Sequence, residues 1–167
     1  MVVLNFPNFP SELTGKTFNE LSEKETGFFT GDEYLPLPND HALQIIILDR
    51  ESLAMVKSLA MSRFNEYLVY GCNSFSYVQK KPLHDKWNSE LGIQEVRQWL
   101  YDLGIPFSQK VFLLYSDNMI VTSWKILVKY WDAFAWSVGV AMYAFDTSMN
   151  WICEFHHEDV ITYSTFN

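Results

Sequence analysis

The chain is poor in cysteine and has no long apolar run. Its two cysteines, Cys72 and Cys153, belong to no CxxC motif and to no Cys/His pair with zinc-finger spacing. The N-terminus lacks the basic region and apolar stretch of a signal peptide, and an unsecreted protein rarely keeps a disulfide, so we expect both cysteines to be buried thiols. No apolar run reaches the ~20 residues of a membrane-spanning helix. These absences favour a soluble, cytoplasmic protein.

Motifs for nucleotide binding and for hydrolysis are also missing. The seven glycines never cluster into GxGxxG or GxxxxGKS/T, the loops that hold phosphates. Ser116 stands in YSDN and not in the GxSxG of a hydrolase nucleophile. The largest basic cluster is Lys80 with Lys81, so the chain has no basic stripe for nucleic acid. We therefore predict no catalytic residue, no metal, no cofactor and no nucleic-acid partner.

Aromatic and acidic residues, by contrast, are plentiful. Of the 167 residues 49% are hydrophobic and 17% aromatic, which is enough material for a core that needs no disulfide. The 20 acidic and 12 basic residues give a net charge of −8, and residues 1–51 alone hold nine acidic and three basic side chains. Such a balance keeps a protein soluble, and it also suits a basic protein partner.

We predict a single domain over residues 1–167, in which an arm precedes an α/β core. Residues 1–41 are expected to be an irregular aromatic and acidic arm laid over the core. Four prolines interrupt regular structure there: Pro7, Pro10, Pro36 and Pro38. Residues 42–167 form the core, of fold class α/β (α+β). We expect a mixed or mainly antiparallel sheet, about three helices and a C-terminal β-meander.

Apolar periodicity locates the elements of this core. Strands are predicted at residues 41–48, 110–115, 138–145, 151–157 and 160–164. One helix is predicted over residues 50–67. A second carries an apolar stripe from Ile93 to Leu103 and ends at Gly104. A third, capped by Ser116 or Asp117, has the stripe Ile120, Trp124, Leu127, Trp131 and Phe134. Residues 80–88, which are polar and include Pro82, are expected to form a loop.

Histidines and carboxylates meet near the C-terminus, at His156, His157, Glu158 and Asp159. Such residues can bind a metal or act as a general base. The HExxH motif is absent, however, and neighbouring residues of a regular strand point to opposite faces. We therefore favour a structural interpretation, in which Glu158 and Asp159 form a turn, one histidine packs and the other is solvated. A small metal-dependent hydrolase is the alternative.

Several aromatic residues fall outside the apolar stripes. Trp87, Trp99 and Trp136 belong to no clear stripe, and Tyr101 lies off the stripe of its helix. Exposed aromatic side chains are enriched in protein interfaces. The alternative is that a second layer, such as the N-terminal arm, covers them.

The C-terminal third resembles a known group of proteins. Residues 124–134 read WKILVKYWDAF, and residues 140–163 read VAMYAFDTSMNWICEFHHEDVITY. A helix rich in Trp, a strand that ends in Asp, a turn followed by Trp and a strand that runs into a His-Glu-Asp turn are similar to the closing segment of small bacterial immunity proteins. Those proteins accompany polymorphic toxins and contact-dependent growth-inhibition toxins. The resemblance implies a cytoplasmic binder that occludes a cognate toxin C-terminal domain, such as a nuclease with a basic cleft, without catalysis.

We therefore predict a toxin-neutralising immunity protein, one half of a toxin–antitoxin pair. Charge and the unplaced aromatic residues suggest partner contacts at Asp32, Glu33, Asp40, Trp87, Trp99, Tyr101 and Asp102. The alternatives are the metal-dependent hydrolase and a general protein-interaction module or homodimer that uses the same aromatic residues.

Overall fold

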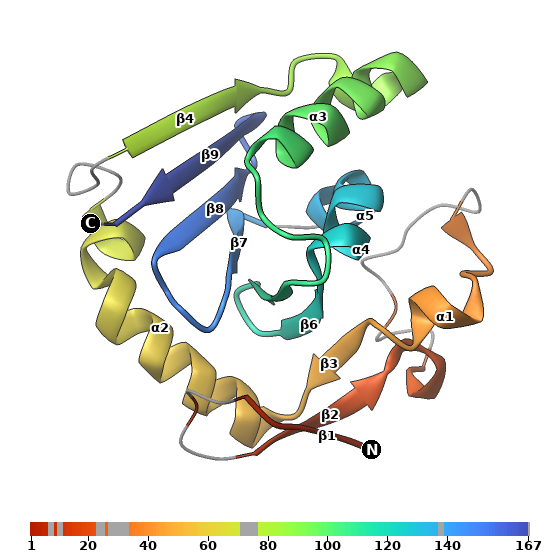
Figure 1. Ribbon diagram of the computed structural model, residues 1–167, viewed down its shortest axis with the longest axis vertical. Coiled ribbons are helices and arrows are strands. Elements are labelled where there is room, and N and C mark those ends of the chain that lie inside the picture. Colours follow the sequence, from red (N-terminus) through yellow and green to blue (C-terminus); the bar gives the residue numbers. More distant parts are fainter. Residues whose placement is uncertain are drawn as a thin grey trace.

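One antiparallel sheet organises the part of the chain that the structure describes, residues 1–6, 9, 12–22, 26, 34–70, 77–136 and 139–166. In this computed structural model, nine strands of those residues follow the order β1-β2-β3-β6-β5-β7-β8-β9-β4 (Figure 1). Every neighbouring pair is antiparallel. With the helices that pack on it, this sheet makes a single α+β domain, so the predicted fold class is confirmed.

The strands are short, and the chain visits them out of spatial order. Their bounds are β1 Val2–Leu4, β2 Leu13–Thr17, β3 Ile46–Leu48, β4 Tyr77–Pro82, β5 Lys110–Leu114, β6 Met119–Ser123, β7 Ala141–Phe145, β8 Trp151–His156 and β9 Val160–Thr165. The predicted C-terminal meander corresponds to β7, β8 and β9. Beyond it the sheet gains one more strand, because β4 pairs with β9 from Tyr77 opposite Thr165 to Pro82 opposite Val160.

Helices cover both faces of the sheet. Within the described residues the α-helices are α1 Asn39–Ala42, α2 Arg50–Tyr70, α3 Glu90–Asp102, α4 Trp124–Lys129 and α5 Trp131–Trp136. Short 3-10 turns occupy η1 Phe18–Glu20 and η3 Lys86–Asn88. Figure 1 shows α2 on one side of the sheet, with α3, α4 and α5 on the other.

Alternation along the strands builds two separate apolar cores. In β5, Phe112 and Leu114 face the α2 side, while Val111 and Leu113 face the side of α3, α4 and α5. Side chains of successive strand residues point to opposite faces, so a strand covered on both sides is apolar throughout. The central strands β5 and β6 are therefore almost entirely buried.

Several predicted elements are confirmed. The helix predicted over residues 50–67 is α2, which buries Val56, Ala60 and Phe64 on one face. Helix α3 ends at Asp102, and Gly104 just beyond its C-cap residue Leu103 is the expected stop, because its φ of 74° lies in the left-handed region that glycine adopts without a steric penalty. Cys153 is a buried free thiol, and burial raises its pKa. Cys72 lies outside the described residues.

The expectation that residues 1–41 are irregular is wrong. The edge of the sheet contains β1 and β2 from this segment, and β2 pairs with β3 from Gly15 opposite Leu48 to Thr17 opposite Ile46. Leu13, Gly15 and Thr17 alternate as buried residues, in the period of a strand. Gly15 has no side chain because a Cβ there would lie 2.4 Å from the carbonyl oxygen of Ile47. Pro36 and Pro38 lie outside these strands.

The third predicted helix starts too early. Met119–Ser123 is strand β6, and residues 115–118 form the turn of the β5–β6 hairpin, so neither Ser116 nor Asp117 caps a helix. The cap is Ser123, whose side chain accepts from the backbone N–H of Ile126 at the start of α4. The run from Met119 to Trp124 is buried throughout, and such a run fits a helix stripe and a two-faced strand equally well.

The predicted loop over residues 80–88 is also shorter than expected. Its first three residues belong to β4, which pairs only with β9 among the described strands and so forms an edge of the sheet. Pro82 is tolerated at the end of an edge strand, because its missing N–H breaks no ladder bond.

We expect the α2 side of the sheet to depend on Phe64. This ring is 1% exposed and packs edge-on against Phe145, with the ring centres 5.4 Å apart. Phe64→Ala should lower the free energy of unfolding by about 3–5 kcal/mol. Leu59→Ala, on the same helix but at a position 36% exposed, should change it by about 0.5 kcal/mol or less. Urea unfolding of both variants measures this, and equal losses would contradict the assignment of faces.

Candidate functional site

A pocket of about 340 Å³ lies where three connections of the chain meet. One wall is the end of β8 and the turn after it, a second is the connection from β4 to η3, and a third is the end of α5. Its lining residues are Leu83, Trp87, Ala135, Trp136, Gly139, Phe155, His156, His157 and Asp159. Three of the four residues of the predicted histidine and carboxylate cluster are thus in its wall, and Glu158 is exposed beside them.

Asp159, in the turn after β8, forms hydrogen bonds with the connection from β4 to η3. Its backbone, with φ of 57°, takes the left-handed conformation that Asp tolerates better than most residues. Its carbonyl oxygen accepts from the backbone N–H of Leu83 at 2.7 Å. One carboxylate oxygen, Oδ1, accepts from the indole Nε1 of Trp87 at 3.0 Å. The pairing of β4 with β9 brings these groups together, since Pro82 and Val160 are register partners.

The two histidines are held in defined hydrogen-bonding states. Nδ1 of His157 lies 2.9 Å from the carbonyl oxygen of Val140, and a carbonyl only accepts, so this nitrogen carries a proton. Nδ1 of His156 accepts from the backbone N–H of Glu158 at 3.2 Å, so that nitrogen is unprotonated. In its neutral form His157 therefore presents a lone pair at Nε2, whereas His156 presents an N–H there.

The expectation that these neighbours point apart is wrong. Their ring centres are only 4.4 Å from each other. The rule of alternating faces holds within a strand, but β8 ends at His156 and His157 belongs to the turn. The other part of the prediction is confirmed, because Glu158 and Asp159 lie in the turn, His156 is half-buried and His157 is exposed.

The described part of the chain contains no group of three or more His, Cys, Asp or Glu side chains arranged to hold a metal ion. His156 and His157 each commit one ring nitrogen to the backbone, as described above. The cluster that suggested a hydrolase from its sequence is therefore, in space, part of a pocket wall with the aromatic residues.

Two tryptophans, Trp87 and Trp136, form the aromatic wall, and a third, Trp131, packs behind Trp87 in the core. The half-buried ring of Trp87 packs on Trp131, which is fully buried, with the ring centres 4.8 Å apart. Trp136, the last residue of α5, meets Trp87 edge-on at 6.1 Å and an interplanar angle of 75°. Trp136 itself is 63% exposed. The indoles thus run from the core to the mouth of the pocket.

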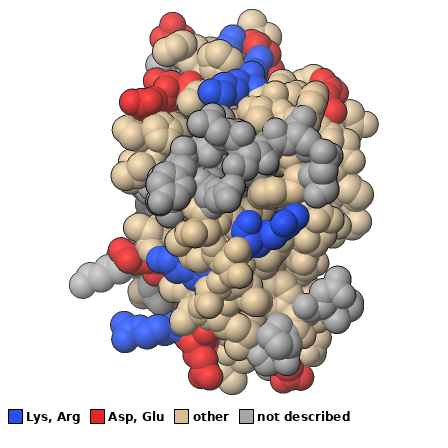
Figure 2. Space-filling view, turned by 90° about the vertical axis from the view of Figure 1, so that its left-hand side faces the viewer, with Lys and Arg blue, Asp and Glu red and all other residues tan. Residues whose placement is uncertain are grey.

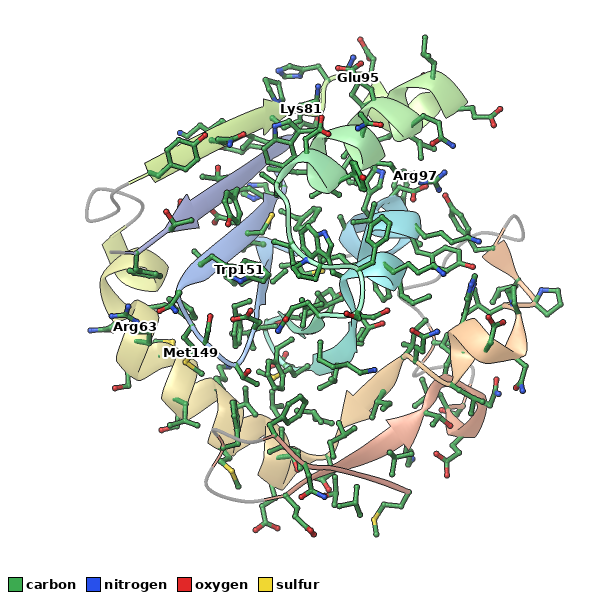
Figure 3. The ribbon with its side chains drawn as sticks, in the orientation of Figure 1. Arg63, Lys81, Glu95, Arg97, Met149 and Trp151 are labelled. Carbon is green, nitrogen blue, oxygen red and sulfur yellow. The ribbon has the colours of Figure 1, made fainter. Side chains whose placement is uncertain are left out.

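Ion pairs brace the connection that contains Trp87. Lys81 of β4 and Lys86 of η3 both bond to the carboxylate of Glu95 on α3, and Figure 3 shows Lys81 and Glu95 next to one another. The hydrogen bond from Lys81, followed by that from Lys86, lowers the pKa of Glu95 to about 2. The pocket is thereby attached to α3 as well as to the sheet.

The predicted partner residues are only partly brought together. Trp87 lines the pocket, but Trp99 is half-buried against the core on the α3 side of the sheet. Tyr101 and Asp102 are exposed near the end of α3, where the Tyr101 ring lies 5.5 Å from that of Phe107. Asp40 is exposed on α1. Asp32 and Glu33 lie outside the described residues.

The prediction missed Trp136, Leu83 and Phe155 as parts of a site. Trp136 gave a signal in the sequence, because it lies off the stripe of its helix. Leu83 and Phe155 gave none, since a buried apolar residue beside a pocket has the same sequence signature as one in the core.

Comparison with protein-family profiles, with curated proteins and with solved structures yields no match to this chain. Among the helices described, none combines the length and the apolar character that crossing a bilayer requires. The chemistry of the pocket and of the surface around it is therefore the basis on which a function can be inferred.

We expect the bond from Trp87 to Asp159 to stabilise the fold. Trp87→Phe keeps the apolar ring but leaves Oδ1 of Asp159 without this donor, which should lower the free energy of unfolding by about 1–3 kcal/mol. Trp136→Phe is the matched control: it should change that value by about 0.5 kcal/mol or less, because Trp136 is mostly exposed. Chemical unfolding monitored by circular dichroism compares the two, and a control that loses as much would contradict the expectation.

Glu95 should contribute to acid sensitivity. Its pKa is about 2 in the folded protein and 4.5 as an ordinary value, so the ion pairs stabilise the fold above about pH 4.5 and this contribution is lost as the pH falls toward 2. In Glu95→Gln, stability should fall less steeply across that window. Urea midpoints measured from pH 6 down to 2 test this, with Glu90→Gln on the same helix as a control that should follow the wild type. A Glu95→Gln slope equal to that of the wild type would contradict the expectation.

Proposed function

We propose that this protein is a cytoplasmic inhibitor of the bacterial immunity type, which binds a toxin domain and occludes its surface. The observation that carries the proposal is the exposed Trp136 beside Trp87 at the mouth of a pocket, with carboxylates next to it. Much of the binding energy of a protein interface comes from a few aromatic residues of this kind, which are exposed in the free protein and buried when the partner binds. The resemblance of the C-terminal third to immunity proteins points to the same class.

The apolar surface at the pocket mouth supports binding to a macromolecule. Trp136 is 63% exposed and Val140 is 68% exposed. Removal of apolar surface from water contributes about 25 cal/mol per Å². Exposed apolar side chains of this size therefore contribute favourably to the free energy of binding when a partner covers them.

Charge supports a basic partner. Near the pocket, Asp85, Glu158 and Asp159 carry negative charge, while the neighbouring Lys81 and Lys86 are both engaged by Glu95. On the face shown in Figure 2, basic and acidic side chains are interspersed. A nuclease must hold phosphates in a basic cleft, and such a surface complements the net charge of −8.

Growth protection tests this function. The proposal predicts that the gene directly upstream encodes a large secreted protein with a toxin as its C-terminal domain. The wild-type protein is co-expressed with that domain, and growth is measured. We expect protection by the wild type and a loss of protection with Trp136→Ala. Tyr101→Ala, which removes an exposed aromatic ring of α3 instead, is the matched control and should protect.

Three outcomes separate the interpretations. Absence of protection by the wild type would overturn the proposal. Protection that survives Trp136→Ala but not Tyr101→Ala would move the binding face to the end of α3. A mass that rises with concentration in sedimentation, without protection, would instead identify the homodimer that the same aromatic residues could form.

A further inference from the structure

We propose that the pocket is a cage for a guanidinium group, and that it receives an arginine side chain of the partner protein. This inference rests on the proposed function for the identity of the partner, but the cage itself is a property of the isolated chain. Three features carry it: the aromatic corner, a carboxylate with no counter-ion among the described residues, and the hydrogen-bonding state of His157.

The aromatic corner provides the first feature. Trp87 and Trp136 meet at 75° with their ring centres 6.1 Å apart, so two π systems border one small volume. A cation within about 6 Å of an indole ring is attracted by the electron density of its face. Trp87 already donates its Nε1–H to Asp159, so the ring contributes to the pocket through its π system rather than through a free donor.

The carboxylate of Asp159 provides the second feature of the cage. It lines the pocket and is half-buried, and within the described residues it forms no ion pair. The nearby ammonium groups of Lys81 and Lys86 are engaged by Glu95 instead. A partly desolvated carboxylate favours a cationic partner, and its bond to Trp87 uses only Oδ1 of its two oxygens.

Of the two histidines, His157 favours a ligand with several donors, whereas His156 presents an N–H at Nε2. Because Nδ1 of His157 donates to Val140, its neutral ring has an acceptor lone pair at Nε2. Together with Asp159, the wall of the pocket thus offers more than one hydrogen-bond acceptor. A guanidinium has five N–H donors in one plane and stacks on aromatic rings, whereas an ammonium group is a compact, strongly hydrated point charge.

The size and the apolar lining suit one long side chain. A volume of about 340 Å³ is near the lower end of the roughly 300–1,000 Å³ that ligand pockets span. Leu83, Ala135 and Phe155 complete the wall with apolar surface. The methylene groups of an arginine side chain can pack on such surface while its head reaches the acceptors.

The test uses the purified full chain and N-acetyl-arginine amide as the probe. Proton–nitrogen spectra record the indole N–H signals of Trp87 and Trp136 during titration at constant ionic strength. We expect saturable shifts of these signals, with a millimolar dissociation constant. N-acetyl-citrulline amide, which is nearly isosteric but uncharged, should bind at least about tenfold more weakly, and N-acetyl-lysine amide should be weaker than arginine.

Two substitutions in the pocket wall test whether the shifts of the indole N–H signals report binding in the cage. Asp159→Asn removes the charge but keeps a carbonyl acceptor for Trp87 and a residue type that tolerates positive φ. It should weaken arginine binding by about tenfold, as should Trp136→Ala. Asp85→Asn is the matched control, since Asp85 also has a positive φ of 60° and lies in the connection from β4 to η3 but not in the pocket wall. It should bind arginine as the wild type does.

The outcomes separate this inference from the proposed function. Absence of saturable binding, equal binding of citrulline, tighter binding of lysine or an effect of Asp85→Asn equal to that of Asp159→Asn would each overturn the guanidinium cage, even if growth protection depends on Trp136. Arginine binding with the expected pattern supports the cage, even if the upstream toxin domain is not neutralised. That result would overturn the proposed immunity function and leave the guanidinium cage supported.

Discussion

Burial of both faces of the central strands is the constraint on which the rest of the structure depends. Val111–Leu114 and Met119–Ser123 place no side chain in bulk water, so the sheet is stable only with a cover on each side. Helix α2 provides one cover, and α3, α4 and α5 provide the other. The short α4 and α5 helices follow directly from β6, and this connection determines where Trp136 leaves the core.

The pocket lies at the border of this two-sided core. Trp131 belongs to the buried layer, Trp87 is half covered and Trp136 reaches solvent. Asp159 holds the connection to Trp87 through one backbone and one side-chain bond. The groups that could recognise a ligand are thus carried by turns and helix ends, while the strands behind them supply rigidity, which is the usual division between binding loops and scaffold.

Sequence patterns identified the elements whose periodicity is unambiguous. Helix α3 has one apolar stripe and a clear glycine stop, and β5 is a short apolar run. Strand β2 was hidden, because its buried positions Gly15 and Thr17 carry no large apolar side chain and the prolines nearby suggested an irregular arm. Strand β6 was hidden for the opposite reason, since a fully apolar run satisfies the helical and the strand period together.

The site was less predictable than the fold, because it depends on contacts between distant parts of the chain. The sequence singled out Trp87 and the histidine and carboxylate cluster separately. Only the pairing of β4 with β9 joins them, across a sequence separation of 72 residues between Trp87 and Asp159. The proximity of the two histidine rings depends on the residue at which β8 ends, and strand ends are the least certain feature of a sequence prediction.

The late partner of β4 has a consequence for biosynthesis. On the ribosome, β4 emerges well before β9, and at about 5–20 residues per second the nascent strand waits several seconds for its only neighbour among the described strands. During that interval the ladder groups of β4 are unpaired. Lys80, Lys81 and Pro82 are residue types that discourage association of a bare strand with other chains. The same three residues therefore protect the chain while it is still incomplete.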